Sequence, residues 1–137
     1  MSNRKDTLDI KSFVFESEDL KTLEEKVNVY IQKNRIFEIE SIDFSFSNFD
    51  NKYMIQGVFN PTNMKKEKSD IEVRFFTAKE PHDSVGMMNR FLLDKQITGY
   101  YVRGIETVQA VRGGETAQTV YVTALTFLKP DRSHNTK

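Results

Sequence analysis

The chain has 137 residues and carries 20 basic and 20 acidic side chains, so its formal net charge at neutral pH is zero. A balanced charge provides no overall field that would attract nucleic acid or an anionic membrane. The sequence has no cysteine and only two histidines, which excludes disulfides and thiol chemistry and argues against a zinc site.

The composition predicts a soluble, cytoplasmic protein without a membrane partner. The first eight residues are polar and lack the apolar stretch of a signal peptide. No apolar run approaches the ~18 residues that a membrane-spanning helix needs. Eleven phenylalanines and five tyrosines compensate for a hydrophobic content of only 38%, because aromatic side chains bury large areas.

The first half of the chain predicts a strand followed by a helix. Residues 10–15 form a short extended segment with apolar side chains on both faces. A helix is expected next, with Ser17 as its N-cap and Asn34 as its stop signal, because apolar residues recur at spacings of three and four. The members of this stripe are Leu20, Leu23, Val27, Tyr30 and Ile31.

Two further strands complete this half. Residues 35–47 are rich in β-forming side chains, but the apolar positions change phase near Ser41, which indicates a β-bulge, a bend or burial on both faces. Residues 48–52 are typical of a hairpin connection. Residues 53–59 then alternate as a strand with one apolar face.

The second half of the chain predicts the same order of elements. A strand over residues 71–77 is followed by a helix with Pro81 in its first turn, where the missing N–H has no helical partner. An extended segment at 97–111, a glycine turn at 112–115 and a β-branched strand at 119–128 follow.

Two pairs of segments support a duplication. Residues 27–31 recur as residues 88–92, and residues 53–59 recur as residues 121–127. We therefore predict an α+β fold made of a duplicated β-α-β-β unit. Its strands are expected to form one mostly antiparallel sheet with both helices on one face, and the two units to be related by a pseudo-two-fold axis.

The predicted organisation is a flexible N-terminus at 1–9, a first repeat at 10–61, a linker at 62–69, a second repeat at 70–130 and a disordered tail at 131–137. Each repeat alone is small for an independent core, which favours packing of the two repeats into one domain. The polar linker also allows an alternative, in which each half wraps its own helix and the chain forms two loosely tethered modules.

Each half also follows a pattern known from a protein family. An amphipathic helix (20–33 and 85–95) is followed by an alternating strand and a polar hairpin, and a Tyr-bearing strand (121–129) ends near a basic residue. This pattern resembles the small Cse60-type sporulation proteins of Gram-positive bacteria. The resemblance implies a tandem version of that family, from such a bacterium or its mobile elements, and it implies no catalytic residues.

No pattern in the chain is typical of catalysis. His82 and His134 are expected to be exposed polar residues rather than bases or ligands. Glu38 and Glu40 form the one carboxylate pair to test for metal or acid–base chemistry, although a solvated strand face is the simpler interpretation. Residues 112–114 favour a turn, and an alternative is that its backbone N–H groups bind an anion. We predict no catalytic, metal-binding or cofactor-binding residues and no cofactor.

The aromatic residues of the strands leave three interpretations open. The first places them in the core of a curled sheet, the second at an interface with another copy or another protein, and the third on a platform that stacks single-stranded nucleic acid. The candidate surface consists of Phe44, Phe46, Tyr100, Tyr101, Arg103 and Arg112.

We therefore expect a non-enzymatic binding or protein-interaction module of unknown partner, which forms an oligomer or binds another protein. One alternative is single-stranded nucleic-acid binding through an aromatic sheet face, which the zero net charge disfavours. A second alternative is small-molecule binding in a cleft between the two repeats.

Overall fold

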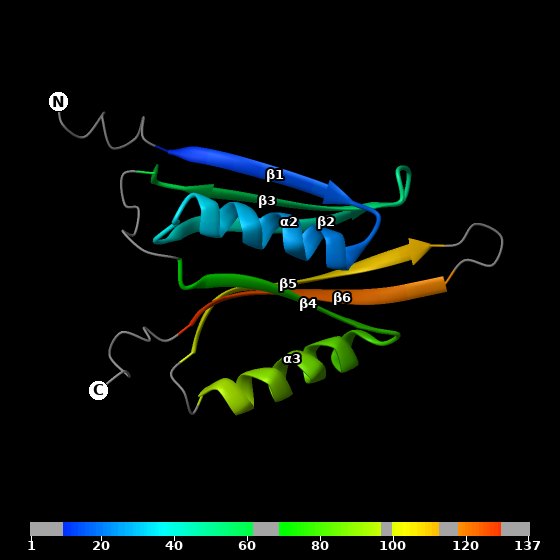
Figure 1. The fold of residues 1–137 in the computed structure, drawn as a ribbon. Helices are drawn as coiled ribbons and strands as arrows, with labels where there is room; N and C mark the ends of the chain where they lie inside the picture. Colours follow the sequence, from blue (N-terminus) through cyan, green and yellow to red (C-terminus); the bar gives the residue numbers. More distant parts are fainter. Residues whose placement is uncertain (1–9, 62–68, 97–99, 113–117, 130–137) are drawn as a thin grey trace.

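The computed structural model describes residues 10–61, 69–96, 100–112 and 118–129, which form six strands and two helices (Figure 1). In chain order the elements are β1 (Lys11–Ser17), α2 (Leu20–Lys33), β2 (Ile39–Ser47), β3 (Lys52–Phe59), β4 (Ile71–Ala78), α3 (Pro81–Gln96), β5 (Tyr101–Arg112) and β6 (Gln118–Leu128). The order β-α-β-β occurs twice, which confirms the predicted α+β class. The predicted flexible N-terminus, the tail and nearly all of the linker and glycine turn lie outside the described residues.

The strands form two antiparallel sheets of three strands each, instead of the one common sheet that the sequence suggested. Sheet 1 has the order β1-β3-β2, and sheet 2 has the order β4-β6-β5. The two sheets do not join at β4 because side chains of α2 hydrogen-bond to its backbone, at Val73 and Phe75. A common sheet would need those backbone groups for a neighbouring strand.

Within each sheet the last strand lies between the other two. Both β1 and β2 pair antiparallel with β3, so they run parallel to each other and α2 is the crossover between them. The second unit has the same arrangement, with β4 and β5 on either side of β6.

Both units carry a register shift at the same place. The shift in β2 lies between Ile39 and Ser41, and the shift in β5 lies between Val102 and Gly104, which are 63 positions further along. The bulge at Glu40 explains the change of apolar phase that the sequence shows near Ser41, because one extra residue reverses the alternation of faces. A shared irregularity of this kind is consistent with the predicted duplication.

The ends of α2 follow from local hydrogen bonds. Its N-cap is Asp19 rather than Ser17: the Thr22 N–H donates to Asp19 Oδ2 at 2.9 Å. Ser17 lies two residues earlier and accepts the Asp19 N–H through its hydroxyl oxygen at 3.1 Å, which positions the cap. Asn34 is the C-cap, as expected, and α3 begins at Pro81, also as expected.

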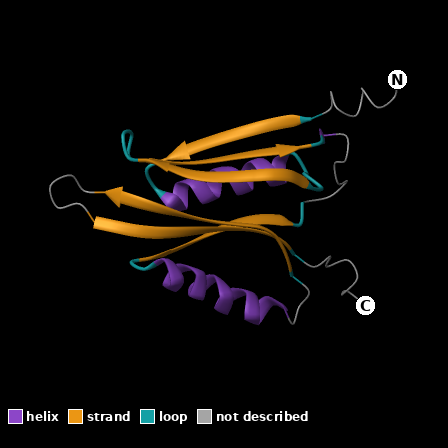
Figure 2. Ribbon diagram, turned by 180° about the vertical axis from the view of Figure 1, so that it is seen from behind, coloured by secondary structure: helices purple, strands orange, loops and turns teal. Residues whose placement is uncertain are grey.

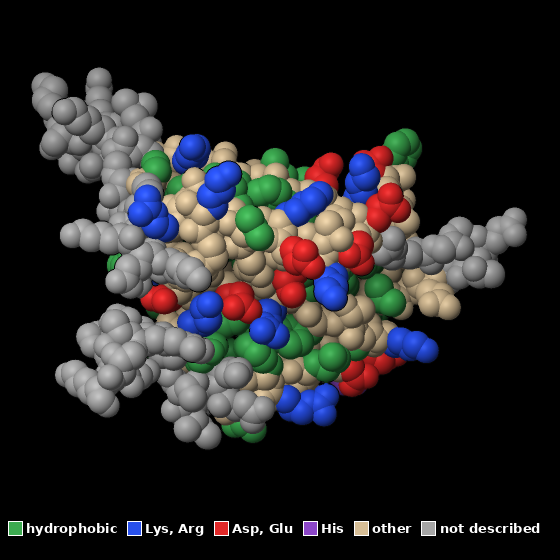
Figure 3. Space-filling model, viewed as in Figure 1, with side chains coloured by type: hydrophobic (Ala, Val, Ile, Leu, Met, Phe, Trp, Pro, Cys, Tyr) green, Lys and Arg blue, Asp and Glu red, His purple; other side chains and the backbone are tan. Residues whose placement is uncertain are grey.

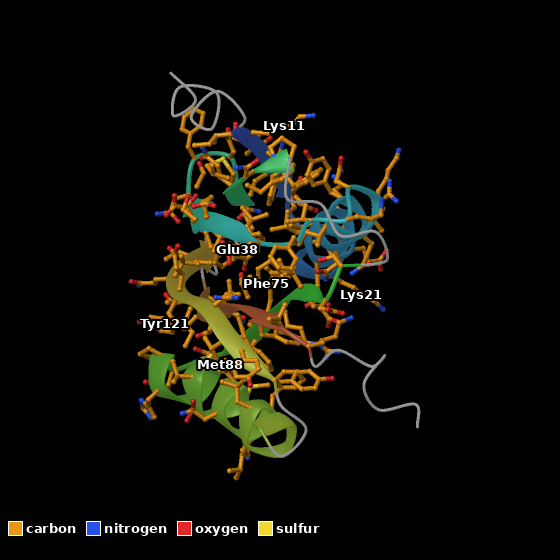
Figure 4. All side chains as sticks on the ribbon, turned by 90° about the vertical axis from the view of Figure 1, so that its left-hand side faces the viewer. Lys11, Lys21, Glu38, Phe75, Met88 and Tyr121 are labelled. Atoms are coloured by element: carbon orange, nitrogen blue, oxygen red, sulfur yellow. The ribbon has the colours of Figure 1, made fainter. Side chains whose placement is uncertain are left out.

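Each helix covers one face of its own sheet, instead of both lying on one face of a shared sheet. Met88 and Leu92 of α3 pack on Leu125 and Phe127 of sheet 2. The opposite face of sheet 2 packs against sheet 1 and α2, so sheet 2 is covered on both of its faces (Figures 2 and 4). The residues of this shared core that come from sheet 2 include Ile71, Val73, Ala110, Val122 and Ala124.

This packing also corrects the expected pseudo-two-fold relation. A two-fold axis would make α3 contact the first unit as α2 contacts the second. The contacts of α3 are with β4, β5 and β6 of its own unit, whereas α2 contacts β4 of the other unit in addition to its own strands. The units are therefore stacked in one direction, like successive repeats of an array.

Candidate functional site

The two phenylalanines of the predicted surface lie in the interior. Phe44 is only 4% exposed, and its ring stacks on Phe75 with 4.9 Å between centroids. Phe46 is half-buried, with its ring 4.8 Å from Tyr53. Both side chains lie on the face of sheet 1 that packs against sheet 2, so neither is available for stacking a nucleobase.

The other predicted surface residues are distributed over β5 and its neighbourhood. Tyr100 is half-buried and stacks on Phe127 at 5.5 Å, whereas Tyr101 is 64% exposed. Arg103 occupies the bulge of β5 and lies 3.8 Å from Glu38 of the first unit. Arg112 ends β5, and its side chain lies outside the described residues. The six residues do not form one continuous surface.

The candidate catalytic residues are likewise dispersed. His82 is exposed, and its Nε2 lies 3.7 Å from Asp83 Oδ1. Glu38 faces Arg103, while Glu40 occupies the bulge of β2. The described part of the chain contains no group of three or more potential metal ligands. None of the helices in the described ranges is long and apolar enough to cross a membrane.

The two units enclose a small space between their sheets. This cavity has a volume of about 10 Å³ and is lined by residues such as Ile42, Phe44, Gly104 and Ala124. It has room for about one water molecule, whereas small-molecule sites usually occupy roughly 300–1,000 Å³. The geometry at this position gives no support to a metabolite site.

One flank of α2 holds the second unit through the backbone of β4. Asn28 donates from Nδ2 to the Val73 carbonyl at 2.9 Å and accepts the Val73 N–H at 2.8 Å. One turn earlier Glu24 Oε1 accepts the Phe75 N–H at 3.0 Å, and one turn later Gln32 Nε2 donates to the Ser69 carbonyl at 2.8 Å.

The spacing of four residues between these polar side chains explains how the helix can hydrogen-bond to the backbone of a strand. Four helical residues rise about 6 Å, and two strand residues span about 6.8 Å. The polar side chains at 24 and 28 therefore meet alternate residues of β4, which are the residues whose backbone groups point away from β6. The sequence signal is three polar residues at a spacing of four, Glu24, Asn28 and Gln32.

The corresponding edge of the first unit, the outer edge of β1, pairs with no strand in the part of the chain that the structure describes. Ser12 and Val14 of β1 are 61 positions before Val73 and Phe75, so their backbone groups point away from β3 by the same alternation. Within the described ranges, the side chain that approaches this edge is Lys26, whose Nζ donates to the Glu16 carbonyl at 3.3 Å. Figures 1 and 2 show β1 at the rim of the molecule, with no described strand beyond it.

An apolar groove of about 400 Å³ lies between this edge and the other flank of α2. Its floor is formed by Phe15 and Tyr30, whose rings meet edge to face at 5.4 Å, and by Val29, which is 63% exposed. Burial raises the pKa of the Tyr30 hydroxyl above its usual value. The remaining lining residues are Glu25, Lys26 and Lys33.

The charge around this groove is mostly basic. Lys26 and Lys33 are exposed on its rim, and Lys11 lies at the start of β1. Figure 3 shows Lys and Arg side chains over the C-terminal half of α2, while acidic side chains gather towards its N-terminal half. Sequence reasoning missed this groove; the available signal was Val29, an apolar residue outside the helical stripe.

No family model matches the chain, and no curated protein or solved structure is significantly similar to it. The resemblance of each half to the Cse60-type proteins therefore stays a prediction.

Proposed function

We propose that this chain is a non-enzymatic protein-interaction module that binds an extended segment of another protein along the outer edge of β1. The observation that carries the proposal is the difference between two equivalent edges. Side chains of α2 occupy the edge of β4, whereas the edge of β1 is open beside an apolar groove. Extended peptides commonly bind such edges by adding a strand.

The geometry supports this mode of binding. A fourth strand would lie ~4.8 Å from β1 and hydrogen-bond to the backbone of Ser12 and Val14. Every second side chain of this added strand would point to the same face as Phe15 and enter the groove between β1 and the flank of α2. Main-chain hydrogen bonds would supply affinity, and the groove would supply specificity.

The test is a proline at the open edge. A display library of 12-residue peptides is selected on the wild-type protein, and the selected peptides are measured by fluorescence polarisation. Val14→Pro removes an outward N–H, so we expect at least a tenfold loss of affinity; edge strands tolerate proline. The matched control Val14→Thr keeps the N–H and should bind like the wild type.

A second readout locates the contact and confirms the fold. Amide hydrogen exchange of Ser12 and Val14 should slow when a selected peptide is bound, and thermal unfolding should show that both variants are folded. Equal binding to Val14→Pro, or a library that yields no binder, would overturn the proposal.

A further inference from the structure

The groove beside β1 has a cation at each end of its helical side. Lys26 and Lys33 are seven residues apart on one flank of α2, or about 10 Å along the helix axis. Neither forms an ion pair with a carboxylate in the described part of the chain, and the nearest partner of Lys26 is the Glu16 carbonyl. Between them lies the apolar floor formed by Phe15, Val29 and Tyr30.

We infer that the bound segment is acidic and carries a large apolar side chain between two carboxylates, with the spacing acidic–x–apolar–x–acidic. This inference rests on the proposed function. In a strand, residues i, i+2 and i+4 point to one face and span about 13 Å. The apolar residue then meets the groove floor, and the flexible lysine stems cover the remaining distance to the two carboxylates.

The pattern reads the same in both chain directions, so a parallel and an antiparallel segment both satisfy it. Among the described residues that line the groove, Glu25, beside Lys26, is the carboxylate. It disfavours a third acidic residue next to the pattern, because like charges repel at short range.

The second unit lacks this site. The positions that correspond to Lys26 and Lys33, 61 residues later, are Met87 and Asp94, and the edge of β4 is already held by Asn28. One bound segment per chain is therefore expected, and titration calorimetry should give a stoichiometry of one.

The test uses synthetic peptides of nine residues whose central sequence is Glu-Thr-Phe-Thr-Glu. The comparison peptides replace both Glu by Lys, or Phe by Ala. We expect the acidic peptide to bind at least tenfold more tightly than either, and its affinity to fall with added salt because the carboxylates are close to exposed cations.

Charge reversal on the protein provides the matched variants. The double variant Lys26→Glu, Lys33→Glu should bind the acidic peptide at least tenfold more weakly than the wild type and should bind the Lys peptide more tightly. Lys21→Glu, at another exposed lysine of α2 away from the groove, should leave both affinities within about twofold.

The outcomes separate the two proposals. If acidic and basic peptides bind alike and both lose affinity with Val14→Pro, the charge pattern is wrong and strand addition stands. If none of the peptides responds to Val14→Pro, strand addition itself fails. A dimer that Val14→Pro converts to a monomer in light scattering would mean that β1 pairs with a second copy of the chain, which would overturn both.

Discussion

The two β-α-β-β units have the same register and the same bulge, but equivalent faces of their sheets meet different surroundings. One face of sheet 2 is buried against the first unit, while the equivalent face of sheet 1 is directed to solvent. The buried positions are Ile71, Val73, Val122 and Ala124, and their counterparts are Ile10, Ser12, Met54 and Gln56. A shared fold thus sets where a side chain points, and its neighbours set which side chain is suitable.

The far end of the stack shows the same effect. Phe44 of β2 is buried under sheet 2, and its counterpart in β5, 63 residues later, is Thr107, which is exposed. Polar residues at some outer positions, such as Ser12, Gln56 and Thr107, suit surfaces that no further unit covers, although apolar side chains such as Ile10 and Leu93 are also exposed there.

The aromatic clusters under the two helices share three corresponding ring positions and differ at a fourth. Tyr30 packs on Phe13, Phe15 and Phe59, and Phe91 packs on Phe76 and Phe127 with the Arg74 guanidinium 5.0 Å from its ring centroid. Arg74 therefore takes the place of Phe13. The partner across the strands changes too, because Phe13 lies opposite Gly57 and Arg74 opposite Leu125.

The largest test of this comparison is Phe44→Ala against Thr107→Ala. Removal of the buried Phe44 ring leaves a cavity between Phe75 and Tyr53, so we expect a loss of about 3–5 kcal/mol in the free energy of unfolding. Thr107 is exposed, but its hydroxyl lies 2.8 Å from that of the buried Thr123, so Thr107→Ala should cost the value of one hydrogen bond, about 0.5–1.5 kcal/mol. Urea unfolding followed by circular dichroism measures both, and equal losses would contradict the stacked arrangement of the units.

A glycine substitution tests why Phe13 faces Gly57 in sheet 1, whereas Arg74 faces Leu125 at the corresponding position of sheet 2. A Cβ at Gly57 would overlap the Phe13 ring, so Gly57→Ala should lower stability by about 2–3 kcal/mol through overpacking. The control is Gly86→Ala in α3, where no atom lies within 4 Å of the new Cβ. It should raise stability by about 0.5–1 kcal/mol because alanine favours the helix. If both substitutions changed the free energy of unfolding in the same direction, the close packing of Phe13 on Gly57 would be contradicted.

Asn28→Ala tests the contact that joins the units. The change leaves the Val73 N–H and carbonyl without their partner, so we expect a loss of about 1–2 kcal/mol in urea unfolding. The corresponding residue of the second unit is the exposed Asn89, and Asn89→Ala should change stability by less than about 0.5 kcal/mol. A neutral Asn28→Ala would show that the helix does not hold β4.

The smallest effect is expected from Tyr30→Phe, which makes the first helix resemble the second at this position. Burial raises the folded-state pKa of Tyr30, so the hydroxyl adds no pH dependence while it is protonated in both states. As the pH rises above about 10, the unfolded chain ionises first and the wild type loses stability until the folded pKa is passed. Tyr30→Phe should lack this part of the decline. The measurement is the free energy of unfolding of both proteins between pH 9 and 11. The same pH dependence in both would contradict the burial of the hydroxyl.

Much of the fold could be predicted because its signals are local. The helical stripe placed α2 at its observed bounds, and the change of apolar phase near Ser41 marked the bulge of β2. The N-cap was misplaced by two residues because Ser17 and Asp19 are both good acceptors, and only the hydrogen bond to Thr22 decides between them.

Less of the candidate site could be predicted. The sequence places Tyr30 on the apolar stripe of the helix, and it gives no signal that sets Lys26 and Lys33 apart from other polar helix residues. Their role as the wall of a groove depends on how α2 lies across Phe15 of β1, which spacing along the chain does not specify.

By itself the sequence determined the α+β class and the order of the elements, β-α-β-β followed by β-α-β-β, because periodicity and turn chemistry act over a few residues. Only the tertiary structure decided that there are two sheets, that Phe44 is buried and that β1 rather than β4 has the open edge. The physical reason is that these features depend on contacts such as Asn28 with Val73, 45 residues apart, and Glu24 with Phe75, 51 residues apart. Which backbone edge a helix satisfies is settled only when distant segments pack together.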